Sequence, residues 1–268
     1  RRAHQTLSKM RAVVGALLVA CTAAAVRAPG GTASPASPEA HQHGRRMPKD
    51  SRVRAALMAL YESTNQPVRP SDTHNRQPWA RSNNWGSMEP TCTWEGVTCD
   101  GFDSLVKLDV HANRLVGTLP SDLAMLAKDD NSKFAVLDVR ENDGLSGTIP
   151  YQLFTSGAES AAKDLEVLQL GATRISGTIP SVLGVGAPKL RQLGATRSEL
   201  SGTVRASFSR LRDLQSLELS EIPISGTIGE ALLNEWPDLV NFDMGRTKVS
   251  GTLAVHLNHL PSAEVFDI

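Results

Sequence analysis

The chain has 268 residues with 28 basic and 28 acidic side chains, so its formal net charge is zero. About 40% of the residues are hydrophobic and only 4% are aromatic, which favours a stacked, repetitive architecture packed by Leu, Ile, Val and Ala. Residues 1–54 carry ten basic and two acidic side chains, whereas the remainder carries 18 basic against 26 acidic. This acidic remainder argues against nucleic-acid binding, and no apolar run reaches the roughly eighteen residues of a membrane span.

The first 28 residues have the layout of a secretory signal peptide. A charged start precedes a short apolar stretch over residues 12–26, and small residues follow near Ala28. The alternatives are a buried helix or an alanine-rich tail. The signal interpretation predicts a protein that is secreted or lies on the extracellular face of the plasma membrane.

Residues 29–50 are rich in Pro, Gly, Ser and Ala and show no hydrophobic periodicity. We expect a disordered linker, because such a segment cannot bury enough apolar surface to offset its ordering entropy. His41 and His43 lie in this segment without further ligands nearby, so we expect a solvated pair and not a metal site.

The chain has three cysteines, Cys21, Cys92 and Cys99. Cleavage of the signal would remove Cys21 and leave two cysteines seven positions apart. An even pair in a secreted chain predicts a disulfide between Cys92 and Cys99. A zinc site is the alternative, but it would need two more ligands at suitable spacing, and none is adjacent.

One sequence pattern recurs from residue 105 to the end, with a base period near 24 residues. The first residues of successive units are Leu105, Phe134, Leu165, Leu190, Leu214, Leu239 and Ala263. We therefore expect residues 105–268 to hold six complete repeats and a partial seventh, truncated at its C-terminus.

The spacing within a unit predicts a strand, a turn and a short helical return. Leu108 and Val110 alternate with polar residues, as a strand with one buried face requires. Asn113 follows at the turn, where its amide can bond buried backbone groups, and Pro120 opens the return. No unit can bury its apolar edge alone, so neighbours must stack. Because helical returns need more room than strands, the stack should bend with its strands on the concave side.

The turn position varies between units. It reads Asn113, Asn142, Thr173, Ser198, Ile222 and Thr247. Hydroxyls can replace one bond of the amide, but an isoleucine side chain can replace none. The fifth turn, at Ile222, should therefore be looser or differently bonded.

The repeat, LxxLxLxxNxLSGxIPxxLxxL, resembles the plant-type leucine-rich repeat over residues 105–268. Residues 52–65 resemble the amphipathic helix of that family's N-terminal cap, and residues 84–99 resemble its paired-cysteine ending. The match in the second segment is carried by Trp94, Gly96, Val97 and Cys99, with Cys92 as the partner cysteine. The resemblance implies an α/β solenoid, a right-handed leucine-rich repeat horseshoe with a parallel concave sheet and short helical or 3-10 convex returns. It also implies a cap over residues 51–104 with a helix and a disulfide.

A cap would cover the apolar end and the unpaired strand edge of the first repeat. Trp79 and Trp85 carry large apolar surfaces that suit this cover. A ligand cage built from these tryptophans is the alternative interpretation.

The strand residues between the buried leucines should point to solvent on the concave face. A plain polar surface that keeps the protein soluble is one interpretation, and a ligand-binding surface is the other. The acidic column within this face predicts a protein or peptide ligand with a basic segment, and the receptor-like resemblance implies a co-receptor. The candidate ligand-binding residues are Lys107, Asp109, His111, Asp138, Arg140, Gln169, Arg191, Glu218, Asn241 and Asp243.

A threonine follows glycine in all six complete units, at Thr118, Thr148, Thr178, Thr203, Thr227 and Thr252. Packing between neighbouring short strands explains such a line. The alternative is a flank that binds a repetitive solid, such as ice or a cell-wall glycan.

The motif search finds no signature of a catalytic site, so we expect no enzyme, no cofactor and no metal. The expected function is extracellular, non-catalytic binding of a protein or peptide, in a receptor-like role through the concave face. Alternatives are a soluble inhibitor of a secreted polysaccharide hydrolase, similar to the polygalacturonase-inhibitor group, a glycan- or ice-binding surface protein, and an adhesion module.

Overall fold

The computed structural model divides the chain into two compact units, Arg1–Arg45 and Arg46–Ile268. All described residues belong to the second unit, which holds both the expected cap and the repeats. The expected signal peptide, nearly all of the expected linker and the pair His41 and His43 lie outside the described residues. The described residues are 49–65, 79–126, 133–155, 160–204, 206–250 and 265–267.

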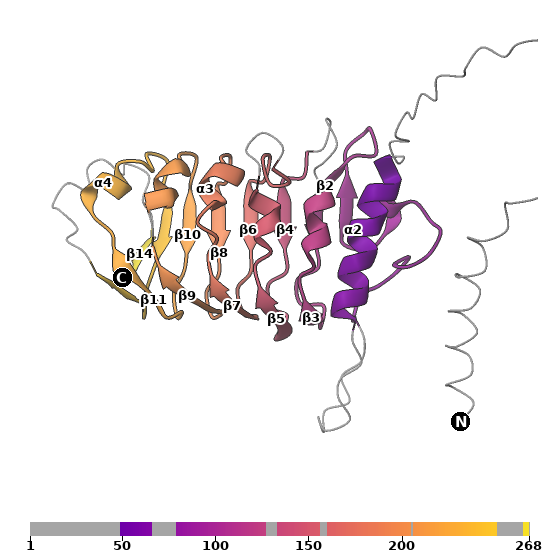
Figure 1. Cartoon of the computed structure of the whole chain (residues 1–268), viewed down its shortest axis with the longest axis horizontal. Helices are drawn as coiled ribbons and strands as arrows, with labels where there is room; N and C mark the ends of the chain where they lie inside the picture. Colours follow the sequence, from indigo (N-terminus) through magenta and orange to yellow (C-terminus); the bar gives the residue numbers. More distant parts are fainter. Residues whose placement is uncertain are drawn as a thin grey trace, which may run out of the picture. The chain divides into compact units, whose positions relative to one another are not determined.

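The repeats and the strand β1 that precedes them build an eight-stranded sheet, which we call the ladder sheet, with the order β1-β2-β4-β6-β8-β10-β12-β14 (Figure 1). From β2 onward every neighbouring pair is parallel. The strands are β1 (Val97–Cys99), β2 (Leu105–Asp109), β4 (Val136–Asp138), β6 (Val167–Gln169), β8 (Gln192–Gly194), β10 (Ser216–Glu218), β12 (Asn241–Asp243) and β14 (Val265–Asp267).

One buried position runs through the ladder sheet from β2 to β12. Its residues pair in register from strand to strand, and each is at most 1% exposed. This column confirms the predicted repeat period and the parallel stack. Its members are Leu108, Leu137, Leu168, Leu193, Leu217 and Phe242.

A second parallel sheet, which we call the flank sheet, follows the turn of each repeat. Its order is β13-β11-β9-β7-β5-β3, so it advances one strand per repeat like the ladder sheet. Its strands are β3 (Val116–Thr118), β5 (Gly144–Thr148), β7 (Arg174–Thr178), β9 (Glu199–Thr203), β11 (Ile224–Thr227) and β13 (Lys248–Ser250).

Packing in the flank sheet explains the recurring Ser-Gly-Thr. The serine hydroxyl of each turn donates to the glycine carbonyl of the preceding turn, as from Ser176 Oγ to Gly147 O at 3.1 Å. At Gly147, Gly177 and Gly202 the threonine methyl of the preceding turn lies over the glycine: a Cβ on Gly177 would meet Thr148 Cγ2 at 3.0 Å. These contacts interlock successive turns of the flank sheet. The threonines of β3, β5, β7, β9 and β11 are exposed, while Thr252 lies outside the described residues, and ice or glycan binding there stays a prediction.

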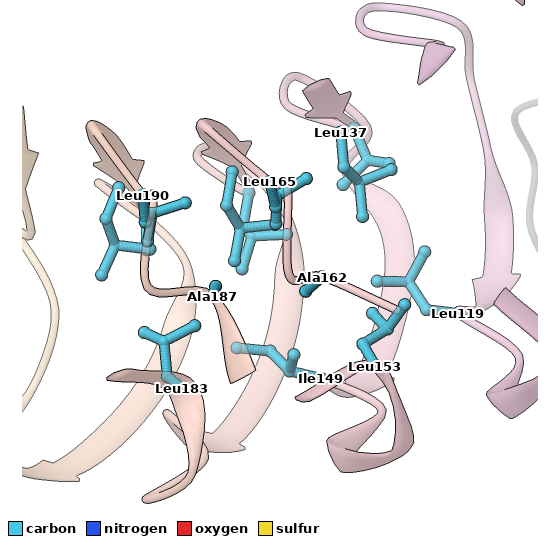
Figure 2. Packing of buried hydrophobic residues seen from close by; sticks show 14 of the residues in the cluster. Leu119, Leu137, Ile149, Leu153, Ala162, Leu165, Leu183, Ala187 and Leu190 are labelled. Carbon is cyan, nitrogen blue, oxygen red and sulfur yellow. The ribbon is translucent and has the colours of Figure 1, made fainter. Parts of the chain in front are cut away.

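Short helices close the first five repeats, as the sequence predicts, and the return of the sixth repeat lies outside the described residues. Each short helix lies in sequence between a strand of the flank sheet and the next strand of the ladder sheet. The helices bury leucine or aromatic side chains between turns, such as Leu123 and Phe154. Figure 2 shows the result: Ala162 and Leu165 of one turn have Ala187 and Leu190 as their equivalents in the next. The returns are η2 (Ser121–Met125), η3 (Tyr151–Phe154), α3 (Leu183–Gly186), η5 (Ala206–Arg210) and α4 (Glu230–Leu233).

The cap consists of α2 (Lys49–Thr64), η1 (Thr91–Thr93) and β1. The helix begins at Lys49, so it includes the last two residues of the expected linker. Strand β1 pairs antiparallel with β2 and so covers the first edge of the ladder sheet. Cys92 and Cys99 form a disulfide with a Cα–Cα distance of 5.6 Å, which confirms the predicted pairing.

An aromatic cluster fills the cap. Trp79 and Trp85 are 4% and 7% exposed and lie against Tyr61 with ring centroids 5.1 and 5.8 Å away. Trp94 contacts Trp85, and the guanidinium of Arg54 lies 5.1 Å from the Trp94 ring centroid. The rings are used to cover the end of the stack, which supports the structural interpretation over a ligand cage.

The turn asparagines bond buried backbone as predicted. Asn142, fully buried, accepts from the backbone N–H groups of Asn113 and Leu115 at 2.9 and 3.0 Å. At the fifth turn, the backbone N–H of Ile224 donates to the carbonyl of Ile222 at 2.9 Å instead. The fifth turn is therefore differently bonded, with the Ile222 side chain buried in the core.

Candidate functional site

The candidate site is the outward face of the ladder sheet, the side opposite the buried leucine column. Because side chains alternate along a strand, the residue after each buried leucine points to this face. These residues pair in register from strand to strand, so they form one continuous column across the sheet. The column reads Asp109, Asp138, Gln169, Gly194, Glu218, Asp243 and Asp267.

The expectation that this whole column is open to solvent is wrong for Asp138 and Gln169. Their exposures are only 6% and 9%. Gln169 fills the space beside Gly194, since a Cβ at that glycine would lie 2.0 Å from Gln169 Oε1. Neighbouring turns thus cover the middle of the column, and its two ends remain more accessible.

The N-terminal end of the face is a network of opposite charges. Asp109 Oδ2 lies 2.9 Å from Lys107 Nζ, and Asp109 Oδ1 lies 2.5 Å from His111 Nδ1. On the next strand, Asp138 Oδ2 lies 3.3 Å from Arg140 Nε. Five of the ten sequence-predicted residues therefore meet here, and the two carboxylates already have cationic partners.

Burial and hydrogen bonding shift the pKa values of these two carboxyls in opposite directions. Partial burial alone would raise the pKa of Asp109, but hydrogen bonds from His111 and Lys107 outweigh it and lower the pKa to about 2. Burial raises the pKa of Asp138, and the backbone N–H and charge of Arg140 offset only part of that rise. Asp109 therefore keeps its negative charge to a lower pH than Asp138 does.

The C-terminal end of the face is built differently. Glu218 and Asp243 are register partners on β10 and β12. Glu218 Oε1 accepts from Ser216 Oγ at 2.8 Å and from Asn241 Nδ2 at 2.9 Å. Asp243 accepts from Ser220 Oγ at 2.6 Å. Within the described ranges, no cationic side chain forms an ion pair with either carboxylate.

The candidate residues chosen from the sequence differ from the observed face at Arg191, Ser216 and Ser220. Arg191 lies one residue before β8, and the register partner of Ser216 on that strand is Gln192. Arg191 instead lies 3.9 Å from Glu166. Ser216 and Ser220 were missed as site residues, although each lies two positions from Glu218 and so shares its face.

None of the helices in the described parts of the chain is long and apolar enough to cross a membrane. The three donors Asp109, His111 and Asp138 are the one group in those parts whose ligand atoms, one per residue, all lie within 4.8 Å of one another.

No family model and no curated protein matches the chain. Among solved structures, it is similar to the leucine-rich repeat ectodomain of the Arabidopsis receptor kinase HAESA in complex with an extended IDA peptide hormone, with 24% identity and a TM-score of 0.64. That match covers 83% of this chain and 33% of the HAESA chain. HAESA in complex with IDA and the co-receptor SERK1 matches at 25% identity and a TM-score of 0.61, over 81% of this chain and 33% of that one.

The leucine-rich repeat ectodomain of the Arabidopsis thaliana receptor kinase SOBIR1 is similar at 22% identity and a TM-score of 0.56, over 75% of this chain and 97% of that one. The chain spans about a third of the length of the HAESA chains. These likenesses show that the chain has the leucine-rich repeat fold, an α/β solenoid.

Proposed function

We propose that this protein is an extracellular, non-catalytic recognition module that binds a peptide or protein with a basic segment on the outward face of its ladder sheet. The fold supports this proposal, because the similar HAESA ectodomain holds a peptide hormone and assembles with a co-receptor. A rigid parallel sheet that presents polar side chains at regular spacing suits recognition of an extended chain.

The pair Glu218 and Asp243 is the observation that carries the proposal. Both carboxylates are partly exposed, and their donors are hydroxyls, an amide and a backbone N–H, all neutral. Neutral donors fix the orientation of a carboxylate and leave its charge uncompensated. A ligand cation placed between adjacent strands would therefore meet two preoriented anions, whereas the N-terminal end of the face neutralises its own charge.

The test is an array of short peptides that differ in the number and position of Lys and Arg, probed with the full chain. We expect the protein to bind peptides with a basic segment and to bind them more weakly at higher salt, because partly exposed charges are screened. The double variant Glu218→Lys and Asp243→Lys should lose this binding.

The matched control is the double variant Glu199→Lys and Asp213→Lys. It changes the net charge by the same amount, but Glu199 belongs to the flank sheet and Asp213 lies between η5 and β10, and both are exposed. Equal loss of binding in both double variants would reduce the effect to net charge. Undiminished binding by the Glu218→Lys and Asp243→Lys variant would refute the site.

A further inference from the structure

Three potential metal ligands meet at the N-terminal end of the outward face. Asp109 and Asp138 are register partners on β2 and β4, and His111 follows Asp109 by two residues, so all three side chains share one face. One donor atom from each residue lies within 4.8 Å of the other two. We propose that Asp109, His111 and Asp138 form a binding site for a divalent transition-metal ion of the Zn²⁺ type.

The geometry needs only side-chain adjustment. Bonds of about 2.0–2.2 Å in a tetrahedral site place ligand atoms roughly 3.4 Å apart. His111 Nδ1 and Asp109 Oδ1, now 2.5 Å apart, would separate to admit the ion, and the Asp138 carboxylate would approach. The backbone can stay fixed, because β2 and β4 are locked by the ladder sheet and the Asp138 side chain is nine-tenths buried.

In each carboxylate, one oxygen contacts a lysine or arginine side chain and the other does not. Lys107 and Arg140 lie against the Oδ2 atoms of Asp109 and Asp138. The Oδ1 atoms face backbone N–H groups and, at Asp109, the imidazole of His111. An ion would therefore approach the Oδ1 atoms, and the positive charges of Lys107 and Arg140 on the Oδ2 side would weaken its binding.

The donor set selects the class of metal. Two carboxylates and one imidazole suit Zn²⁺ and similar first-row ions, whereas Ca²⁺ and Mg²⁺ prefer oxygen ligands alone. With the ion on Nδ1 of His111, the ring proton moves to Nε2. Three protein ligands leave a fourth position for water or for a group of a molecule on the outward face.

The test measures binding of Zn²⁺ alone by calorimetry, and of Co²⁺ by the visible absorption bands of a four-coordinate ion. It uses the full chain with His41→Ala and His43→Ala, which removes the histidine pair of the N-terminal segment. We expect one ion per chain. Because loss of an outer-shell partner already costs about 10–100-fold in affinity, His111→Ala and Asp138→Asn should each cost at least tenfold.

Two further variants keep the result decisive. Asp213→Asn, at an exposed carboxylate outside the donor group and outside the outward face, should bind the ion like the parent chain. Lys107→Met removes a positive charge next to the ion and should raise the affinity by roughly tenfold, a gain that misfolding cannot produce. Thermal melting identifies a variant that fails to fold; if Asp138→Asn does so, His111→Ala and Lys107→Met decide.

The absence of saturable one-to-one binding, or an unchanged affinity in His111→Ala, would overturn the proposal. The measurement contains no peptide, so it stands or falls independently of the proposed recognition of a basic segment by Glu218 and Asp243.

Discussion

Replacing Asn142 with alanine should remove the most heavily used polar side chain of the stack. Its Oδ1 accepts two backbone N–H bonds at 2.9 and 3.0 Å, and its Nδ2 lies 3.0, 2.7 and 3.1 Å from three backbone carbonyls. The side chain is fully buried. Alanine leaves two buried N–H groups without this acceptor, and each such loss costs about 1–3 kcal/mol. We therefore expect Asn142→Ala to lower the free energy of unfolding by about 3–5 kcal/mol.

Thr173 occupies the equivalent turn position and provides a matched control. Its hydroxyl donates to the carbonyl of Leu170 at 2.7 Å and accepts weakly from the backbone N–H of Ile175 at 3.3 Å. With one good hydrogen bond at stake, Thr173→Ala should cost about 1 kcal/mol. The difference between the two variants measures what the amide adds beyond a hydroxyl in the same place.

The assay is urea unfolding followed by far-UV circular dichroism, with the slope compared between variants. An unchanged slope with a lower midpoint means that the folded state has lost stability. A smaller slope would mean that part of the repeat array unfolds separately, as neighbouring repeats can. If Asn142→Ala costs no more than Thr173→Ala, the hydrogen bonds of Asn142 do not carry the stability assigned to them.

The remaining predictions concern the core, the cap, a flank-sheet glycine and the loss of stability at low pH. Leu168→Ala should cost about 2–5 kcal/mol through cavity formation, and a cost below about 0.5 kcal/mol in urea unfolding would contradict its buried register. Cys92→Ser should lower cap stability by about 2–3 kcal/mol, seen as a lower melting temperature that reducing agent does not lower further. Gly117→Ala should cost roughly 2–5 kcal/mol, because its φ is +137° and a Cβ would lie 1.9 Å from a carbonyl oxygen of α2. Gly101 has open space around it, so Gly101→Ala should be nearly neutral. Equal melting temperatures of the two variants would refute this prediction. Because the pKa of Asp109 is lowered to about 2, its stabilising contribution is present above the ordinary value of 3.8 and is lost as the pH falls toward 2. The urea midpoint should therefore fall more for the wild type than for Asp109→Asn between about pH 5 and about pH 2, and parallel decreases would contradict the shift.

Periodicity made the fold predictable from sequence. A leucine that recurs at the same place in every repeat can be buried only by the same leucine of the next turn. The register of Leu108 with Leu137 and Leu168 therefore followed from the repeat pattern, although insertions lengthen these two units to 29 and 31 residues. The disulfide followed from the even number of cysteines that the expected signal cleavage would leave. The Ser-Gly-Thr interlock did not follow, because it depends on a methyl of one turn reaching the glycine of the next.

Exposure along the outward face could not be predicted in the same way. Every residue of the column occupies the same position in its own repeat, yet cover comes from side chains 20 to 30 residues away in sequence. Gln169 is buried because Gly194 leaves room for its amide, and no pattern within one repeat contains that information. The alternation of side chains along a strand predicts the face to which a side chain points, whereas its burial depends on the side chains of the neighbouring turns.

This difference changes which residues can test recognition. From sequence, charge reversal at Asp138 and Glu218 would serve equally well. Asp138 is nearly buried and lies against Arg140, so a lysine there would place two positive charges together and destabilise the sheet, whatever the protein binds. Glu218 and Asp243 are partly exposed and oriented by neutral donors, so reversing their charges leaves no buried cation unpaired. A loss of peptide binding without a loss of stability can therefore be attributed to recognition only at this end of the face.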